Sequence, residues 1–296
     1  MGTRNGPTGQ RANGPTETHM KLIRYGEKGK ERPGLMQEGR IVDLRGIFPD
    51  LPDIDAGFFE NGWLEKVAAV RESGDEMDVR IGSPVAHPSK IICLGKNYAE
   101  HAREGGFERP EAPMLFSKAP SALNGPFDPI ILPQSSLQVD WEVELAVVIG
   151  RSAKRVAAAN AFDYIAGFSV MNDVSGRDAQ FGDAQWFRGK SFDTFAPFGP
   201  VLVTPDEIDD IGNLKLTTRV DGHMMQEGNT VDMIFDIPFI LEYISRDITL
   251  LPGDIISTGT PAGVGIFRDP PIVLKPGNVV ECRIEKIGAI QNTVLA

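Results

Sequence analysis

The segment VDWEVELAVVIG, residues 139–150, constrains the fold more than any other stretch of the sequence. Its alternating pattern predicts a β-strand, because successive side chains of a strand point to opposite faces of the sheet. One face is apolar from end to end, whereas the other starts with Asp140, Glu142 and Glu144, which would lie about 6–7 Å apart along the strand. Residues 145–149 are apolar on both faces, so the strand is expected to enter the interior of a sheet.

A row of like charges on such a strand needs a physical reason. Carboxylates on one strand face repel each other, and a solvated edge strand that carries them is the alternative interpretation. Inside the protein they need a compensating cation, and a clustered pair suits a hard divalent metal ion. A third oxygen ligand is expected from Asp173, which stands where an apolar segment stops, although Asp173 could instead cap the following turn. Three carboxylates without His or Cys favour Mg²⁺ or Mn²⁺ over zinc.

Length and composition narrow the class of protein. We expect residues 1–19 of the 296-residue chain to be a disordered expression leader, because they are polar and lack the apolar core of a signal peptide. The net charge of −11 argues against nucleic acid or an anionic membrane as a partner. No apolar run approaches the roughly 20 residues of a membrane-spanning helix. Cys93 and Cys282 lie in apolar segments, which suggests buried free thiols in a reducing compartment, and we therefore predict a soluble cytoplasmic protein.

The rest of the chain divides into two units that differ in their pattern of predicted strands and helices. Residues 20–85 contain strand-like and helical segments, which predicts a small N-terminal α/β domain. Residues 86–296 contain many short strand-like segments separated by Gly, Pro and Asp, together with one amphipathic helix within 231–250. Asp221-Gly222 lies between alternating residues and predicts a tight hairpin. The predicted fold class is therefore α+β and mainly β.

Two further segments carry residues suited to catalysis. His101 and Glu104 are three residues apart in a short helical segment, so they can touch, and a His held by a carboxylate is suited to act as a general base. Gly105 and Gly106 would end that helix and let it move as a lid. Lys190 would stay charged beside a carboxylate cluster and could neutralise an oxyanion. The alternatives are a surface His–Glu pair and an ordinary surface lysine.

The Gly-rich turn DIISTGTPAGVG, residues 254–265, is a third candidate. It has neither the lysine of a phosphate loop nor the glycine fingerprint of a dinucleotide site, so nucleotide binding is rejected. Backbone N–H groups of the turn, such as that of Gly259, and the hydroxyl of Thr260 could still hold a carboxylate or carbonyl oxygen. The turn is therefore predicted to contribute to substrate binding.

Six segments in a fixed order resemble the fumarylacetoacetate hydrolase family and cover nearly all of residues 90–281. They are GKNYAEH, DWEVELAVVIG, NDVSGRDAQ, GKSFDTFAPFGP, VDGHMMQEGNT and GDIISTGTPAGVG. The resemblance implies the mixed β-sandwich roll of that family, a homodimer, and one bound Mg²⁺ or Mn²⁺. The N-terminal segments KLIRYGEKGKERPGL and GRIVDL are similar to a bacterial subgroup whose members are named ureidoglycolate lyase or 2,4-diketo-3-deoxy sugar-acid hydrolase.

The resemblance also implies roles for individual residues. The expected metal ligands are Glu142, Glu144 and Asp173, whereas Asp140 begins the motif without serving as a ligand. The lid dyad that activates water is expected to be His101 and Glu104. The residues expected to line the substrate site are Gln180, Lys190 and Thr260.

These parts imply a reaction on a 2-oxo acid. The leading hypothesis is hydrolysis of a C–C bond in a 2,4-diketo acid, an acylpyruvate or a 2,4-diketo-3-deoxy sugar acid, through a metal-bound enolate. A lyase, isomerase or decarboxylase acting on a related 2-oxo acid or on ureidoglycolate is the alternative, because the same enolate serves those reactions. A non-catalytic 2-oxo acid binding protein is a third hypothesis. The His101–Glu104 pair argues against it, because a binding protein has no need of a base.

Overall fold

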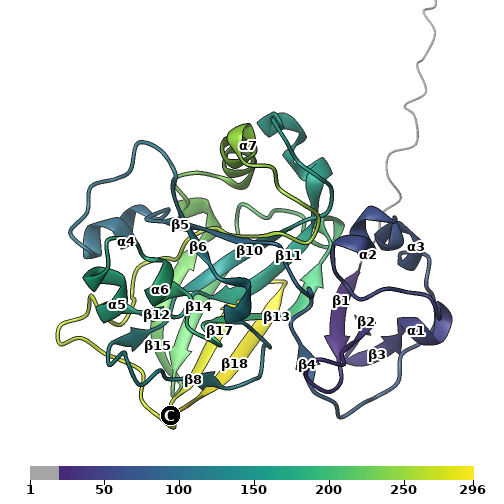
Figure 1. The fold of residues 1–296 in the computed structure, drawn as a ribbon, viewed down its shortest axis with the longest axis horizontal. Helices are drawn as coiled ribbons and strands as arrows, with labels where there is room; N and C mark the ends of the chain where they lie inside the picture. The colour runs from purple at the N-terminus through teal and green to yellow at the C-terminus, as the bar shows by residue number, and fades with distance from the viewer. Residues whose placement is uncertain (1–19) are drawn as a thin grey trace, which may run out of the picture.

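The computed structural model describes residues 20–296, in which β-sheet is the main regular structure (Figure 1). The expected leader, residues 1–19, lies outside the described residues. Strands far outnumber helices, and the helices are short except for one of 11 residues. The structure therefore confirms an α+β fold that is mainly β. No helix within residues 20–296 is long and apolar enough to cross a lipid bilayer.

The largest sheet contains eleven strands. In spatial order they are β3 (Arg40–Asp43), β2 (Arg32–Gln37), β1 (Lys21–Tyr25), β13 (Ala196–Val203), β11 (Ile165–Asn172), β10 (Val143–Ile149), β16 (Ile255–Ser257), β5 (Ile91–Gly95) and β6 (Met114–Lys118), with β4 (Ile81–Gly82) beside β1 and β7 (Leu123–Asn124) beside β13. Only the β16–β5 and β13–β7 pairs are parallel. The strand order places β10 and β11 near the centre of this mixed sheet.

A second sheet of five strands packs against the first. Its order is β15 (His223–Asn229), β14 (Lys215–Val220), β17 (Val279–Ile284), β18 (Gly288–Leu295) and β8 (Ile130–Ile131). A two-stranded ladder joins β12 (Ser175–Gly176) to β9 (Val139–Asp140). Apolar side chains of β10 share one buried cluster with those of β14, β17 and β18. The two sheets thus form a sandwich whose core lies between them.

The strand predicted over 139–150 is interrupted in the structure. β9 ends at Asp140 and β10 begins at Val143, and every residue of β10 is buried. The apolar face predicted from the alternation packs in the sandwich core, whereas Ala146 and Val148 on the other face belong to a second buried cluster. Both faces of β10 are therefore covered, which excludes the solvated edge strand.

The predicted hairpin and amphipathic helix are both present. Val220 pairs with His223 across Asp221 and Gly222, whose φ angles of 50° and 81° are typical of a type I′ turn. The helix expected within residues 231–250 is α7 (Ile237–Asp247). The helix starts six residues after the beginning of the predicted segment 231–250, because the Asp236 side chain caps it there. The residues before it include a separate 3₁₀ turn, η4 (Thr230–Asp232).

The other helices are short and lie outside the sheets. They are α1 (Leu44–Ile47), α2 (Ala56–Glu60), α3 (Trp63–Val67), α4 (Ala99–Glu104), α5 (Arg177–Gly182) and α6 (Phe187–Lys190). The further 3₁₀ turns are η1 (Pro120–Ala122), η2 (Ala158–Tyr164) and η3 (Pro205–Glu207). Figure 1 shows α4, α5 and α6 grouped at one end of the sandwich, away from the N-terminal helices α1, α2 and α3.

The N-terminal unit is joined to the rest through the large sheet. Leu22 of β1 pairs with Leu202 of β13, so β1 to β4 extend the central sheet (Figure 1). The unit also buries apolar residues beneath its own helices, among them Leu44 and Phe58. The division into domains 20–85 and 86–296 stays a prediction.

A partly buried ion network also links the N-terminal unit to the rest of the protein. Arg80 donates to Glu31 at 2.8 Å and to Asp128, in the loop before β8, at 2.6 and 2.8 Å. Burial alone would raise the pKa of Glu31, but Arg80 and Arg24 lower it below its ordinary value of 4.5. Because this pKa is depressed in the folded protein, the stabilisation is complete above about pH 5 and is lost as the pH falls through the folded pKa.

We expect Arg80→Met to lower the free energy of unfolding by about 1–3 kcal/mol at pH 7, because it removes the guanidinium from Asp128 and leaves Glu31 with Arg24 only. The loss should be smaller at pH 4, where Glu31 begins to be protonated during unfolding. Urea denaturation at the two pH values measures both effects. An equal loss at pH 7 and pH 4 would show that packing, and not charge, explains the role of Arg80.

Candidate metal and substrate site

Three carboxylates converge at the end of the β10–β11 pair. Val143 pairs with Asn172, so the flanking residues Glu142 and Asp173 are neighbours, and the Asp173 N–H donates to the Glu142 carbonyl at 2.9 Å. Glu144 follows on the same face as Glu142. One ligand oxygen of each residue lies within 4.8 Å of the others, and all three residues are buried. The structure thus brings the three predicted metal ligands together.

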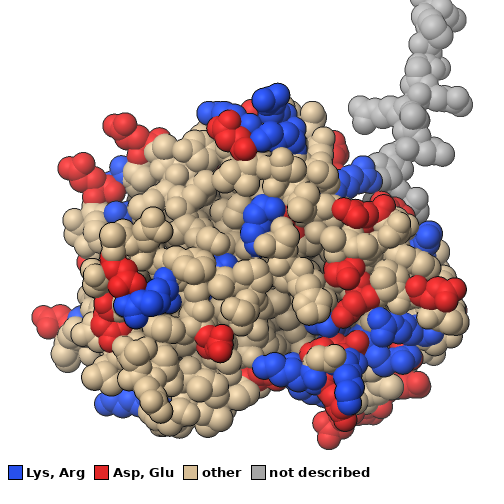
Figure 2. All heavy atoms as spheres, in the orientation of Figure 1, with Lys and Arg blue, Asp and Glu red and all other residues tan. Residues whose placement is uncertain are grey.

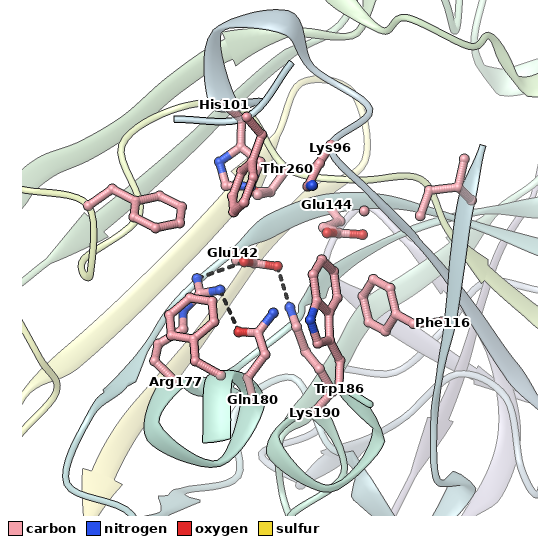
Figure 3. Close-up of a pocket in the computed structure, with 15 residues that line it drawn as sticks. Lys96, His101, Phe116, Glu142, Glu144, Arg177, Gln180, Trp186, Lys190 and Thr260 are labelled. Atoms are coloured by element: carbon pink, nitrogen blue, oxygen red, sulfur yellow. Dashed lines mark hydrogen bonds and ion pairs between the residues drawn. The ribbon is translucent and has the colours of Figure 1, made fainter. Parts of the chain in front are cut away.

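Asp140 lies outside this group. Because β9 is separate from β10, its carboxylate accepts from Arg177 Nε at 2.6 Å and from the Ile266 N–H at 2.8 Å. Arg177 also donates to Glu142 at 2.7 Å and to Gln180 at 3.0 Å (Figure 3). Asp140 therefore positions the guanidinium that contacts Glu142.

Buried lysines neutralise Glu142 and Asp173. Lys190 Nζ lies 2.6 Å from Glu142 Oε2 and 2.8 Å from Asp173 Oδ2, and Lys118 donates to the other oxygen of Asp173. Burial alone would raise the pKa of Glu142, but Lys190 and Arg177 hold it well below its usual range. Burial alone would lower the pKa of Lys190, but Asp173 and Glu142 raise it. Lys190 is therefore charged, as expected.

Glu144 differs from the other two carboxylates because it has no ion pair among residues 20–296. Its Oε2 accepts from the Ser257 hydroxyl at 2.5 Å and from the Gly259 N–H at 2.9 Å, which are neutral donors. Burial, and then the charges of Asp173 and Glu142, raise the pKa of Glu144 well above its ordinary value. The positive charge that this carboxylate lacks is what a metal ion would supply.

The residues fit a hard divalent cation. All candidate ligand atoms are carboxylate oxygens, the donors that Mg²⁺ and Mn²⁺ prefer. Four buried carboxylates (Asp140, Glu142, Glu144 and Asp173) face three buried cations (Lys118, Arg177 and Lys190), so the cluster has a net negative charge. A divalent ion would reverse that charge and prepare the site for an anionic ligand.

His101 and Glu104 form the predicted pair on α4. His101 Nδ1 lies 2.8 Å from Glu104 Oε1, and Glu104 Oε2 accepts from the Gly263 N–H at 2.8 Å. When the Nδ1–H of neutral His101 donates to the Glu104 carboxylate, Nε2 is left as the basic nitrogen. His101 is 9% exposed and lines the same cavity as Glu142 and Glu144 (Figure 3). The structure thus places a histidine held by a carboxylate beside the three carboxylates that could bind a metal ion.

Of the predicted substrate-binding residues, Gln180 and Thr260 line the cavity, whereas Gly259 does not. Gln180 presents its amide group to the cavity next to Lys190 (Figure 3). The Thr260 hydroxyl donates to the Val143 carbonyl at 2.9 Å, so its hydrogen is not free for a substrate. The Gly259 N–H is held by Glu144. The turn therefore supports Glu144, and both predicted donors of the turn already have acceptors within the protein.

Sequence reasoning missed several residues of the cavity. Lys118 ends an ordinary apolar strand, so nothing local marks it as the partner of Asp173. Arg177 could have been found, because it is the cation nearest in sequence to Asp173 within the same motif. Aromatic side chains form a large part of the cavity wall, and Lys96 joins them. The aromatic residues are Phe107, Phe116, Phe181, Trp186 and Phe267.

Comparison with known proteins supports the family resemblance seen in the sequence. The family model described as fumarylacetoacetate (FAA) hydrolase C-terminal matches residues 90–295. The chain is 44% identical over 289 residues to the Bos taurus protein named oxaloacetate tautomerase FAHD2A, mitochondrial, covering 94% of this chain and 92% of that protein. The human protein of the same name is 43% identical over 288 residues, covering 93% of this chain and 92% of that protein.

Solved structures confirm the expected β-sandwich roll. The fumarylacetoacetate hydrolase from Exiguobacterium antarcticum is 38% identical with a TM-score of 0.81, covering 94% of this chain and 99% of that one. The maleylpyruvate hydrolase from Sphingobium sp. SYK-6 is 31% identical with a TM-score of 0.74, covering 93% and 99%. That structure is a complex with manganese(II) ion and pyruvate.

The relatives overturn one prediction. The bovine and human proteins are named as mitochondrial, so the prediction of a cytoplasmic location is wrong. The prediction depended on two free thiols, which are indeed buried and unpaired. Buried thiols indicate a reducing environment, and they do not identify the compartment.

Proposed function

Because the chain belongs to the fumarylacetoacetate hydrolase family, we propose that it is a divalent-metal-dependent enzyme that interconverts the keto and enol forms of oxaloacetate. The observation that carries this proposal is that two carboxylates of the cluster, Glu142 and Glu144, line the same cavity as His101, whose ring is held by Glu104. The names of the bovine and human relatives supply the substrate. Sequence reasoning placed hydrolysis first, and the relatives now favour the isomerase alternative.

The residues have complementary tasks in this reaction. A bound divalent ion would polarise the keto oxygen of a 2-oxo acid and stabilise negative charge on it. His101 Nε2 takes a proton from the enol hydroxyl or from the adjacent carbon and returns it at the other position, so the reaction needs no water. Glu104 holds the ring and stabilises its protonated form. Lys190 and Gln180 line the same cavity and would stabilise the oxygen on which charge develops.

Hydrolysis of a 2,4-diketo acid is a second candidate, favoured by the aromatic walls of the cavity. These walls suit an acyl chain better than a small polar group. His101 would accept a proton from water, and the hydroxide would attack the distal carbonyl carbon. The bond between C3 and C4 would then break, giving a carboxylic acid and the enolate of pyruvate, which would take the proton held by His101 at C3. One neighbour, a maleylpyruvate hydrolase, supports this candidate.

One assay distinguishes the two reactions. The metal-loaded protein is mixed separately with the enol form of oxaloacetate and with 2,4-dioxopentanoate, and products are followed by NMR. Tautomerisation gives keto oxaloacetate with no change in carbon skeleton, whereas hydrolysis of the diketo acid gives acetate and pyruvate. Failure to accelerate either reaction would contradict the proposed function.

We also propose that the protein is a homodimer. β8 is an edge strand of the second sheet, and apolar side chains are exposed on and near it, with Leu137 84% exposed and Phe127 51% exposed. Figure 2 shows mostly uncharged surface over this part of the molecule. Sedimentation analysis is expected to give twice the chain mass of 32.2 kDa. A single species at the chain mass over all concentrations would rule the dimer out.

A further inference from the structure

Lys96 is a cation of the cavity that the reaction above does not use. Of the lysine and arginine side chains lining the cavity, Arg177 and Lys190 are paired with carboxylates, whereas Lys96 has no ion pair within residues 20–296. Its amino group lies 3.7 Å from the centre of the Phe107 ring. Figure 3 shows Lys96 entering the cavity from the same side as His101. An ammonium group that contacts only a ring can exchange this contact for a stronger one with an anion.

The backbone holds Lys96 in place. Its φ angle is 59°, a left-handed conformation that residues with a β-carbon rarely adopt. The next residue, Asn97, fixes this turn through its side chain, which donates to the Thr258 carbonyl at 2.8 Å and accepts from the Phe235 N–H at 2.8 Å. The backbone at Lys96 is thus held by two segments far away in sequence, at Thr258 and Phe235.

The charge of the site leaves room for one further anionic group. Four buried carboxylates and three buried cations leave one negative charge, and a divalent ion changes this to one positive charge. The carboxylate next to the keto group of a 2-oxo acid then makes the site neutral. A second carboxylate would be unpaired in an aromatic cavity, and burying such a charge is strongly unfavourable. Lys96 supplies the matching positive charge.

We propose that Lys96 determines specificity for dicarboxylic 2-oxo acids by binding the carboxylate farther from the keto group. The proposal rests on the proposed function, because it takes the metal cluster as the site of the first carboxylate. On binding, the amino group leaves the Phe107 ring and contacts the second carboxylate. Phe107 follows the glycines at the end of α4, so this exchange also connects substrate binding to the segment that carries His101.

A matched pair of ligands tests the proposal. Oxaloacetate and 2-oxobutanoate share the 2-oxo acid group and differ in having a carboxylate or a methyl at C4. Binding to the Mn²⁺-loaded protein is measured by calorimetry for wild type, Lys96→Met and Lys96→Arg. Lys275→Met, which removes an exposed lysine outside the cavity, is the charge-matched control. Melting temperatures of all four proteins establish that each one folds.

Lys96→Met is expected to weaken oxaloacetate binding by about 10- to 100-fold, the usual size of a charged hydrogen bond, and to change 2-oxobutanoate binding by less than about threefold. Lys96→Arg should retain much of the preference, and Lys275→Met should leave it unchanged. Equal weakening of both ligands, or no preference in wild type, would overturn the proposal. If wild type binds both acids but tautomerises neither, the proposed function fails while the role of Lys96 stands. If it binds neither, both proposals fail.

Discussion

Replacing Glu144 by glutamine is expected to abolish metal-dependent turnover and, in the same protein, to stabilise the metal-free fold. Turnover should fall by at least about 100-fold, because a metal ion typically contributes several kcal/mol to the stabilisation of a developing charge. The melting temperature of the metal-free protein should rise by about 2–4 °C, which corresponds to about 1 kcal/mol. The two changes have opposite directions, which few other substitutions would produce.

The opposite signs follow from the surroundings of Glu144. Its carboxylate is buried, receives only neutral donors, and lies near Glu142 and Asp173. Glutamine keeps an oxygen that can accept from Ser257 and from the Gly259 N–H, and it removes the cost of either burying an unpaired charge or protonating the carboxylate on folding. The same substitution removes one of the three proposed metal ligands, so a divalent ion would be held by two carboxylates only.

Thermal unfolding with EDTA and with Mn²⁺ measures both parts. Wild type should gain stability from Mn²⁺, whereas Glu144→Gln should gain little. Glu60→Gln changes an exposed acid on α2 and is the control, expected to behave as wild type. A Glu144→Gln protein that is less stable than wild type in EDTA would contradict the account of an unpaired charge.

Replacing His101 by alanine is expected to lower kcat by about 10²- to 10⁴-fold while leaving metal binding intact, because general base catalysis contributes factors of this size. Its Nε2 is the basic nitrogen at the cavity, and its ring does not contact the three carboxylate ligands through any hydrogen bond in residues 20–296. Glu104→Gln should cost less, because it keeps a group that can hold the ring but loses the charge that stabilises protonated His101.

Kinetics and Mn²⁺ titration of the same proteins separate the two functions. His223→Ala removes an exposed histidine on β15 and should be neutral in both measurements. Unchanged turnover in His101→Ala, for every 2-oxo acid tested, would show that another group is the base. Loss of Mn²⁺ binding in His101→Ala would show that the histidine belongs to the metal site.

The carboxylate cluster could be predicted from sequence because it follows from local geometry. The period of a strand places Glu142 and Glu144 on one face, and the end of an apolar segment exposes Asp173. Antiparallel pairing of β10 with β11 then brings them together. The His101–Glu104 pair was also predictable, because residues three apart on a helix are neighbours. Each of these inferences requires knowledge of only one helix, one strand or one pair of strands.

The compensating charges could not be predicted in the same way. Lys118 reaches Asp173 across 55 residues, and the break between β9 and β10 depends on tertiary pairing with β12. The use of the Gly259 N–H by Glu144 depends on how β16 packs beside β10. The continuation of the sheet from β1 into β13 was missed for the same reason, since strand propensity does not specify a partner.

Hydrogen–deuterium exchange at C3 of oxaloacetate tests the central claim most directly. Exchange in D₂O, followed by NMR, reports removal of the C3 proton by the protein, whichever product forms later. We expect exchange well above the rate without protein for the Mg²⁺- or Mn²⁺-loaded enzyme, and a return to that background after metal removal or in His101→Ala. Exchange that is equally fast in the metal-free protein, or exchange that never exceeds the background, would contradict a metal-dependent 2-oxo acid enzyme with His101 as its base.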